Sequence, residues 1–142
     1  LKKRMKKYPN VICIQSAVSN QETSLKLYFH KNSDQNPIKW GQASSLVVEK
    51  TNVDENNFVQ VKTIDFAKFI KNLNCNIAFI KMDIECYEYT VIKHLIEQDS
   101  FQHISLMRVE PHNCSSIQDD KKWVESAITE HNLSNKILFD WH

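Results

Sequence analysis

Short apolar segments in the first half of the chain have the spacing of β-strands. Residues 24–30 alternate between apolar and polar positions, which predicts a strand with one face in water. Residues 11–14 are a continuous and largely β-branched run, which predicts a strand buried on both faces. Residues 31–57 are rich in Asn and Ser and predict a long surface loop. The elements expected in this half are a helix over 1–7 and strands at 11–14, 24–30, 45–48 and 58–62.

The second half of the chain alternates between predicted helices and predicted strands. Asp65 is placed to cap a helix in which four apolar residues follow the i, i+3, i+4, i+7 spacing of one buried face. The alternation predicts a single α/β domain over residues 1–142, with parallel strands, right-handed crossovers and helices on both faces of the sheet. The elements expected here are helices at 65–73, 87–96 and 121–131 and strands at 77–84, 104–109 and 137–139. The residues expected on buried helix faces include Phe66, Phe69, Ile70, Leu73, Trp123, Ala127 and Ile128.

Charge and hydropathy restrict the classes of partner that the chain is expected to bind. The chain has 18 Lys and Arg against 17 Asp and Glu, so no overall field directs it to nucleic acid or to an anionic membrane. A basic cluster at residues 2–7 lacks interleaved aromatic residues and is interpreted as a solvated helix face. No stretch has the roughly 18 consecutive apolar residues of a membrane span, and no signal peptide is expected. We expect no nucleic-acid partner and no membrane span, and the compartment stays open, with the cytoplasm slightly favoured.

The counts of cysteine and glycine restrict the chemistry further. Cys13, Cys75, Cys86 and Cys114 form no C-x-x-C pair, which argues against a structural zinc site and a dense disulfide framework. Reduced thiols are therefore expected. The single glycine, Gly41, stands where average usage would give about ten. These 142 residues therefore contain no glycine-rich phosphate or nucleotide loop.

Acidic residues follow two of the predicted strands in the second half. Asp83 and Glu85 come at the end of one strand, and Glu110 and His112 follow the next. Ligands of open α/β sheets bind at the carboxyl ends of the strands, so the four side chains are expected to converge on one crevice if the strands are neighbours. An alternative is that Asp83 or Glu85 caps the helix that follows. Glu88 is expected to have this structural role.

Several blocks of the chain resemble a known enzyme family. Residues 81–88, Lys-Met-Asp-Ile-Glu-Cys-Tyr-Glu, resemble the most specific block of the FkbM methyltransferases. The resemblance covers residues 11–112. It implies a class I, Rossmann-like methyltransferase sheet of which this chain supplies the later strands, while the N-terminal strands and the glycine-rich cofactor turn are expected to precede it. The other blocks, in order, are residues 17–20, 44–46, 63–65 and 109–112.

The resemblance implies S-adenosylmethionine as the cofactor. The turn at Ser16, Ala17 and Val18 is expected to line the adenine, and Asp83 to face the methionine portion of the cofactor and the acceptor. Glu85 is expected among the cofactor-binding residues. Cys86 stands where the family usually has glycine, a residue that permits unusual backbone angles. Three interpretations stay open: the turn tolerates the cysteine, the site is no longer under selection for catalysis, or the thiol is reactive.

The resemblance also places Glu110 and His112 on the acceptor side. The expected reaction is a displacement at the cofactor methyl, in which alignment of the reacting groups does most of the work. His112 is the preferred base because its ordinary pKa is about 6.5, and Glu110 or Asp83 is expected to orient it. An alternative is that Asp83, Glu110 and His112 bind Mg²⁺ or Mn²⁺, since carboxylates and imidazole suit these ions.

Two functions follow from these expectations. The first is O-methylation of a hydroxyl group on a sugar, a lipid or a small metabolite, with loop 31–57 shaping the acceptor pocket. The second is a non-catalytic, truncated methyltransferase-like domain that acts at most as an interaction module. A missing central strand would leave an open sheet edge, which favours self-association.

Overall fold

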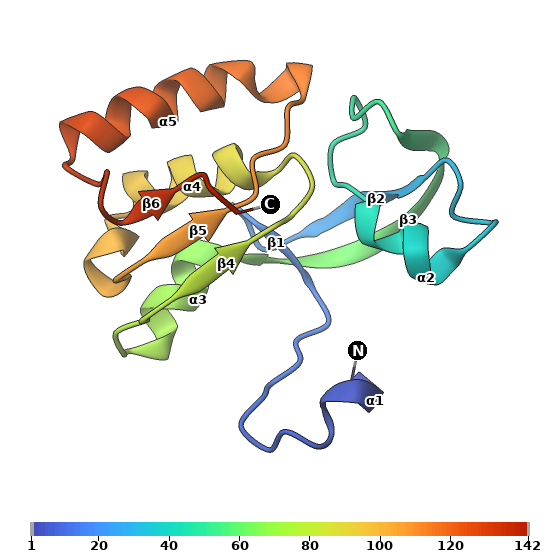
Figure 1. Ribbon diagram of the computed structural model, residues 1–142, viewed down its shortest axis with the longest axis horizontal. Coiled ribbons are helices and arrows are strands. Elements are labelled where there is room, and N and C mark those ends of the chain that lie inside the picture. The colour runs from blue at the N-terminus through green and yellow to red at the C-terminus, as the bar shows by residue number, and fades with distance from the viewer. Residues whose placement is uncertain (1, 142) are drawn as a thin grey trace.

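The computed structural model describes residues 2–141, which include two three-stranded sheets and a layer of helices (Figure 1). In the first sheet, β3 (Val53–Asp65) lies between β1 (Ala17–Ser19) and β2 (Ser24–His30). β3 is antiparallel to β2, and its last three residues pair in parallel with β1. The alternating pattern over residues 24–30 therefore predicted β2 correctly, whereas β3 is longer than the predicted strand at 58–62.

The second sheet is parallel and has the order β4–β5–β6. Its strands are short: β4 is Ile80–Met82, β5 is Met107–Val109 and β6 is Ile137–Leu138. An isolated bridge between Ile77 and Ile104 extends the pairing of β4 and β5 at their amino ends. Parallel pairing of these strands was predicted, but β3 does not join them. Among the described residues β4 is an edge strand.

One face of the second sheet is covered by helices and the other is not. α4 (Glu88–Glu97) packs against α3 (Phe66–Leu73) and α5 (Gln118–Glu130). Side chains of the sheet on one face are buried, apart from the partly buried Ile80, whereas those on the opposite face are exposed or half-buried. The expectation of helices on both faces is therefore wrong for residues 2–141. The side chains on the covered face are Ile80, Met82, Met107, Val109 and Ile137, and those on the uncovered face are Lys81, Arg108 and Leu138.

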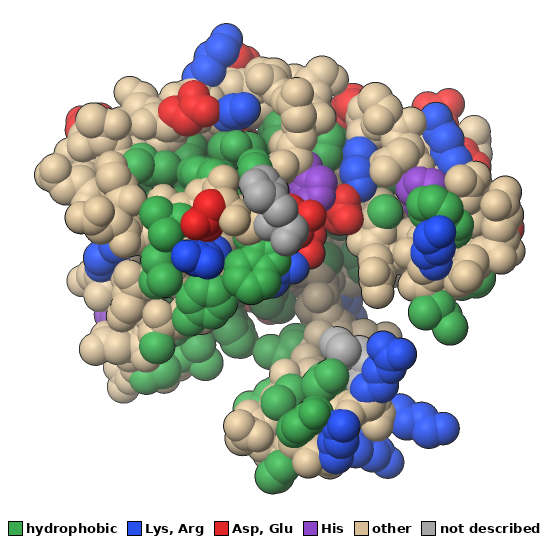
Figure 2. All heavy atoms as spheres, viewed as in Figure 1, with side chains coloured by type: hydrophobic (Ala, Val, Ile, Leu, Met, Phe, Trp, Pro, Cys, Tyr) green, Lys and Arg blue, Asp and Glu red, His purple; other side chains and the backbone are tan. Residues whose placement is uncertain are grey.

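The uncovered face carries an aromatic and charged group of side chains, and Figure 2 shows hydrophobic side chains gathered there. The rings of Phe79 and Trp141 lie 6.3 Å apart, and the ammonium of Lys81 lies 5.4 Å from the Trp141 ring. Phe79, which directly precedes β4, is 46% exposed.

Local signals located the start of α3, but α5 begins at Gln118 rather than at residue 121, and not all of the buried helix faces were predicted. Asp65 accepts a hydrogen bond from the Lys68 amide at 3.0 Å and caps α3, as predicted. Leu73, however, is 44% exposed and Trp123 is 37% exposed, so these two predictions of burial are wrong. Val124 is fully buried in α5 in place of Trp123. The remaining buried helix residues include Ala67, Ile70, Val91, Ile92, Leu95 and Ala127.

The N-terminal segment leads away from the rest of the molecule (Figure 1). It begins with the short helix α1 (Lys2–Met5), and its basic side chains gather on one side (Figure 2). Residues 11–14 form no strand and Ile12 is 87% exposed, so the strand predicted there is wrong. A β-branched run becomes a strand only where another strand pairs with its backbone.

Loop 31–57 contains short helices rather than a strand at 45–48. These are α2 (Pro37–Trp40) and the 3₁₀ helix η1 (Gly41–Ala43), and Ser45 makes only an isolated bridge with Tyr28. Two further 3₁₀ helices, η2 (Ser100–His103) and η3 (Ser115–Ile117), precede β5 and α5. Among residues 2–141, no helix combines the length and apolar character needed to cross a membrane.

Candidate active site at the carboxyl ends of β4 and β5

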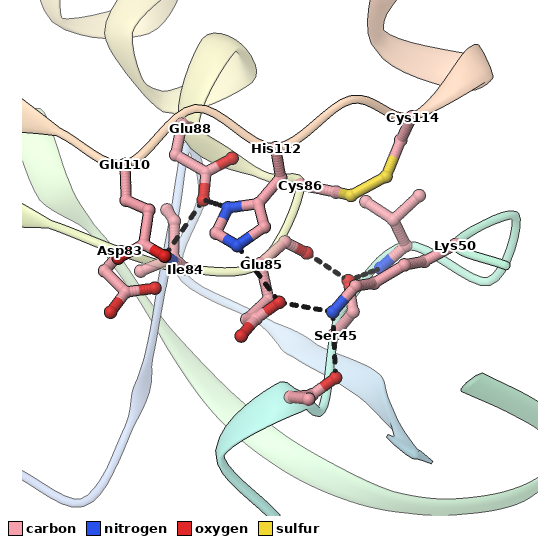
Figure 3. A network of polar contacts seen from close by, with 12 residues as sticks. Ser45, Lys50, Asp83, Ile84, Glu85, Cys86, Glu88, Glu110, His112 and Cys114 are labelled. Atoms are coloured by element: carbon pink, nitrogen blue, oxygen red, sulfur yellow. Dashed lines mark hydrogen bonds and ion pairs between the residues drawn. A yellow bond between two sulfur atoms is a disulfide. The ribbon is translucent and has the colours of Figure 1, made fainter. Parts of the chain in front are cut away.

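The acidic turn between β4 and α4 lies against the segment that follows β5 (Figure 3). Met82 pairs with Val109, and the Glu110 amide donates a hydrogen bond to the Met82 carbonyl at 2.9 Å. Because the two strands are parallel neighbours, their carboxyl ends meet at the same edge of the sheet. The structure therefore brings the residues after β4 and those after β5 into one cluster.

His112 lies between two glutamates of this cluster. Its Nδ1 is 2.9 Å from Oε1 of Glu88, and its Nε2 is 3.3 Å from Oε2 of Glu85. Glu88 is fully buried, and the same Oε1 accepts a hydrogen bond from the Ile84 amide at 3.0 Å. Glu88 thus holds the turn before α4 and the imidazole. It does not cap α4 as expected, and neither does Asp83 or Glu85, because the N-cap is Tyr87 and no side chain of the described residues bonds to the first amides of the helix. The expectation that Glu110 or Asp83 orients His112 is wrong, because Glu88 and Glu85 make the contacts.

The two glutamates affect the protonation of His112. The hydrogen bond to Glu88 raises the pKa of His112 above its ordinary value of 6.5, and the negative charges of Glu88 and Glu85 act in the same direction. Burial and the positive charge of Lys50 lower the pKa. The net shift is upward, so the imidazolium form is favoured in the folded state.

This upward shift predicts a pH-dependent contribution of His112 to stability. The contribution is fully present below about pH 6.5 and is lost as the pH rises through the folded-state pKa. We expect the free energy of unfolding of the wild type to exceed that of His112→Asn by more at about pH 5.5 than at about pH 8.5. Urea unfolding at both pH values measures this difference. His131→Asn, at an exposed position, is the control. An equal difference at both pH values for His112→Asn would contradict the pKa shift.

Lys50 connects the long loop to the acidic turn and was missed by sequence reasoning. Its side chain is 8% exposed and its ammonium pairs with Oε2 of Glu85. The ammonium also donates a hydrogen bond to the Ala43 carbonyl at 3.0 Å, and the Ser45 hydroxyl donates one to the Glu85 carbonyl. No local pattern marked Lys50, because it is one of many polar residues in a loop.

Asp83 and Glu110 form the exposed side of the cluster. Each side chain is 33% exposed, and the Lys81 ammonium lies 2.6 Å from Asp83 Oδ2 and 3.9 Å from Glu110 Oε2. One donor atom from each of Asp83, Glu110 and His112 lies within 4.8 Å of the others, a spacing that a divalent cation could bridge. The ammonium of Lys81 already supplies positive charge to the two carboxylates.

The turn at residues 85–86 has an unusual backbone and carries a disulfide bond. Glu85 and Cys86 have φ values of 58° and 86°, in the left-handed region that favours glycine. Cys86 is bonded to Cys114, with their Cα atoms 6.0 Å apart. The expectation of four reduced thiols is therefore wrong for this pair, although Cys13 and Cys75 are free. The two partners are 28 residues apart, so only the fold shows that they meet.

The predicted adenine-binding residues lie apart from the acidic cluster. Ser16 and Ala17 line a groove together with residues of β2 and β3, among them Leu27 and Val61. Val18 packs against the core.

The carboxyl end of β1 approaches the start of α4 through one side chain from each of the family-like blocks 17–20 and 81–88. Asn20 accepts a hydrogen bond from the Tyr87 hydroxyl at 3.2 Å. β1 therefore borders the groove at Ala17, and the residue after it, Asn20, contacts the turn before α4.

Comparison with known proteins agrees with the sequence blocks. The model of the methyltransferase FkbM domain matches residues 2–130. No curated protein and no solved structure matches the chain significantly. The matched range includes the acidic turn, the segment carrying His112 and all of α5. The chain therefore belongs to the FkbM methyltransferase family.

Proposed function

We propose that this protein transfers a methyl group from S-adenosylmethionine to a hydroxyl group of a sugar, a lipid or a small metabolite. In this proposal the strands belong to a class I, Rossmann-like sheet. The observation that carries the proposal is the cluster at the carboxyl ends of β4 and β5, in which buried Glu88 holds His112 beside the exposed carboxylates of Asp83 and Glu110.

The charges of the cluster fit a cationic cofactor. It contains the four carboxylates of Asp83, Glu85, Glu88 and Glu110, against two lysine ammonium groups. S-adenosylmethionine carries a sulfonium and an ammonium group, so an acidic and partly exposed site suits it. Asp83 would hold the methionine portion, and Ser16, Ala17 and Val18 would contact the adenine. Glu85, which pairs with Lys50, would also contact the cofactor.

The bound cofactor supplies an electrophilic methyl group, and the residues of this chain prepare the acceptor. Glu88 fixes the Nδ1 side of His112. Nε2 faces Oε2 of Glu85, and in this proposal an acceptor hydroxyl group takes the place of Glu85 beside Nε2 and gives up its proton there. The imidazolium that forms is stabilised by Glu88 and Glu85. Asp83 and Glu110 line the exposed side, where an acceptor would enter. Positioning of the hydroxyl group then accounts for much of the rate.

Calorimetric titration with S-adenosylmethionine tests the cofactor site. We expect the wild type to bind the cofactor and Asp83→Asn to bind it about tenfold more weakly, because one charge-assisted contact is lost. Glu130→Gln, at the exposed end of α5, is the matched control and should bind as the wild type does. Equal affinity of Asp83→Asn and the wild type would remove Asp83 from the site.

A second candidate function is a non-catalytic methyltransferase-like domain that acts as an interaction module. One observation favours it: β4 is an unpaired edge strand among the described residues. Open edges promote strand pairing between copies. Absence of cofactor binding together with concentration-dependent dimers in sedimentation experiments would support this function over methyl transfer.

A further inference from the structure

We propose that the Cys86–Cys114 disulfide is a positioning device that holds the segment carrying His112 against the acidic turn. The inference deepens the proposed function and rests on it where His112 is taken as the base. Figure 3 shows the bond beside the His112 ring, on the side away from Asp83 and Glu110.

The disulfide joins the segment that carries His112 to the segment that carries its two glutamate partners. Cys86 follows Glu85 directly and precedes Glu88 by two residues, and Cys114 follows His112 by two residues. Both contacts of His112, to Glu88 and to Glu85, therefore cross between the bonded segments. A covalent link at this place limits how far the imidazole can move from both glutamates.

Apart from the contacts of His112 with Glu85 and Glu88, the described residues give the segment carrying His112 little support. Residues 111–114 have no regular secondary structure, although β5 ends just before them and η3 begins just after. The hydrogen bond from the Glu110 amide to Met82 is the last of the strand pairing. Beyond it, the Gln118 side chain donates hydrogen bonds to Asn113 and to the Cys114 carbonyl, which lie within the same part of the chain. The disulfide is thus the covalent tie from this segment to the turn before α4.

The backbone of the acidic turn gives a reason for a cysteine at this position. A φ of 86° at Cys86 is a conformation that side chains other than glycine rarely adopt. Glycine would suit the backbone but could not form the bond. Both sulfur-bearing residues are buried, with Cys86 1% and Cys114 6% exposed, so the bond is shielded from thiols in solution. These features suit a permanent structural disulfide better than one that exchanges with thiols in solution.

Chemical reduction breaks the Cys86–Cys114 disulfide without changing the sequence. Tris(2-carboxyethyl)phosphine cleaves the S–S bond, is oxidised to the phosphine oxide with oxygen from water, and the two hydrogens of that water complete the two thiols. Thiol titration of the denatured, unreduced chain first checks the bond. We expect two free thiols of the four cysteines, from Cys13 and Cys75. Four free thiols would overturn the proposal.

Nuclear magnetic resonance of the His112 ring then tests the positioning. In the oxidised chain we expect a slowly exchanging Nδ1–H signal, because this proton lies in the bond to Glu88. After reduction, and in Cys114→Ser, this signal should be lost to exchange with water while the circular dichroism spectrum is retained. The double variant Cys13→Ser/Cys75→Ser keeps the disulfide and should keep the signal. An unchanged signal in the reduced chain would overturn the proposal.

Two further readouts separate positioning from folding and from activity. If Cys114→Ser does not fold, Cys86→Gly removes the same bond and relieves the turn, so it should fold and still lose the signal. Loss of folding in both variants would overturn a positioning role in favour of a purely structural one. Where methyl transfer is measurable, reduction should lower kcat by roughly 10- to 100-fold with a smaller change in KM for the cofactor. A lost ring signal in a chain without methyl transfer would uphold the positioning and refute the proposed function.

Discussion

Replacement of Glu88 by alanine is expected to lower the free energy of unfolding by about 3–5 kcal/mol, the range for breaking a buried charge pair. The Glu88 side chain is fully buried in the first turn of α4. Its Oε1 is shared by the Ile84 amide and by His112, so the substitution leaves a partly buried amide and a partly buried imidazole without their partner. Urea unfolding at neutral pH measures the change.

Two other variants show which property of Glu88 matters. Glu88→Gln keeps an oxygen for the Ile84 amide but loses the charge, so it should destabilise the fold less than Glu88→Ala does. Glu97→Ala changes an exposed glutamate at the other end of α4 and is expected to stay within about 0.5 kcal/mol of the wild type. A Glu88→Ala variant as stable as Glu97→Ala would show that the buried contacts contribute nothing.

Replacement of His112 by alanine is expected to lower the rate of methyl transfer by about 10²–10⁴-fold, the usual contribution of a general base. The loss should fall on kcat, because the proposed role of His112 is to take the proton of the acceptor hydroxyl. Release of S-adenosylhomocysteine in the presence of pooled sugar, lipid and small-molecule hydroxyl compounds measures the rate. His131→Ala, an exposed histidine at the end of α5, is the matched control.

The pH profile gives a second test of the same role. The neutral imidazole is the active form of a base, and the pKa of His112 is raised by Glu88. The rate should therefore rise with pH through a value above about 6.5 and then level off. Glu88→Gln should move this rise to lower pH, since it removes the charge that favours the imidazolium. A profile that does not respond to Glu88→Gln would argue that another group takes the proton.

Loop 31–57 is tied to the candidate active site rather than being an independent surface feature. Lys50 and Ser45 both contact Glu85, through its carboxylate and its carbonyl. Glu85 in turn lies 3.3 Å from His112. Lys50 and Ser45 are therefore linked to His112, the proposed base, through Glu85. This connection is consistent with the proposal that the loop shapes the acceptor pocket.

Local sequence signals predicted much of the secondary structure. Alternation of side chains defined β2, and the capping residue Asp65 defined the start of α3, because both signals depend on neighbours within a few positions. The same reasoning failed at residues 11–14, where no other strand supplies backbone partners. It also misplaced Trp123, since burial in α5 depends on which face meets α4.

The sequence by itself determined the family and the acids at the two strand ends, because residues 81–88 form one continuous block and strand ends are local features. The tertiary structure decided which groups meet. It paired His112 with Glu88, brought Lys50 to Glu85, and joined Cys86 to Cys114. These partners are 24, 35 and 28 residues apart. No local pattern encodes such contacts, because they follow from the packing of parallel strands, a helix start and a long loop at one edge of the sheet.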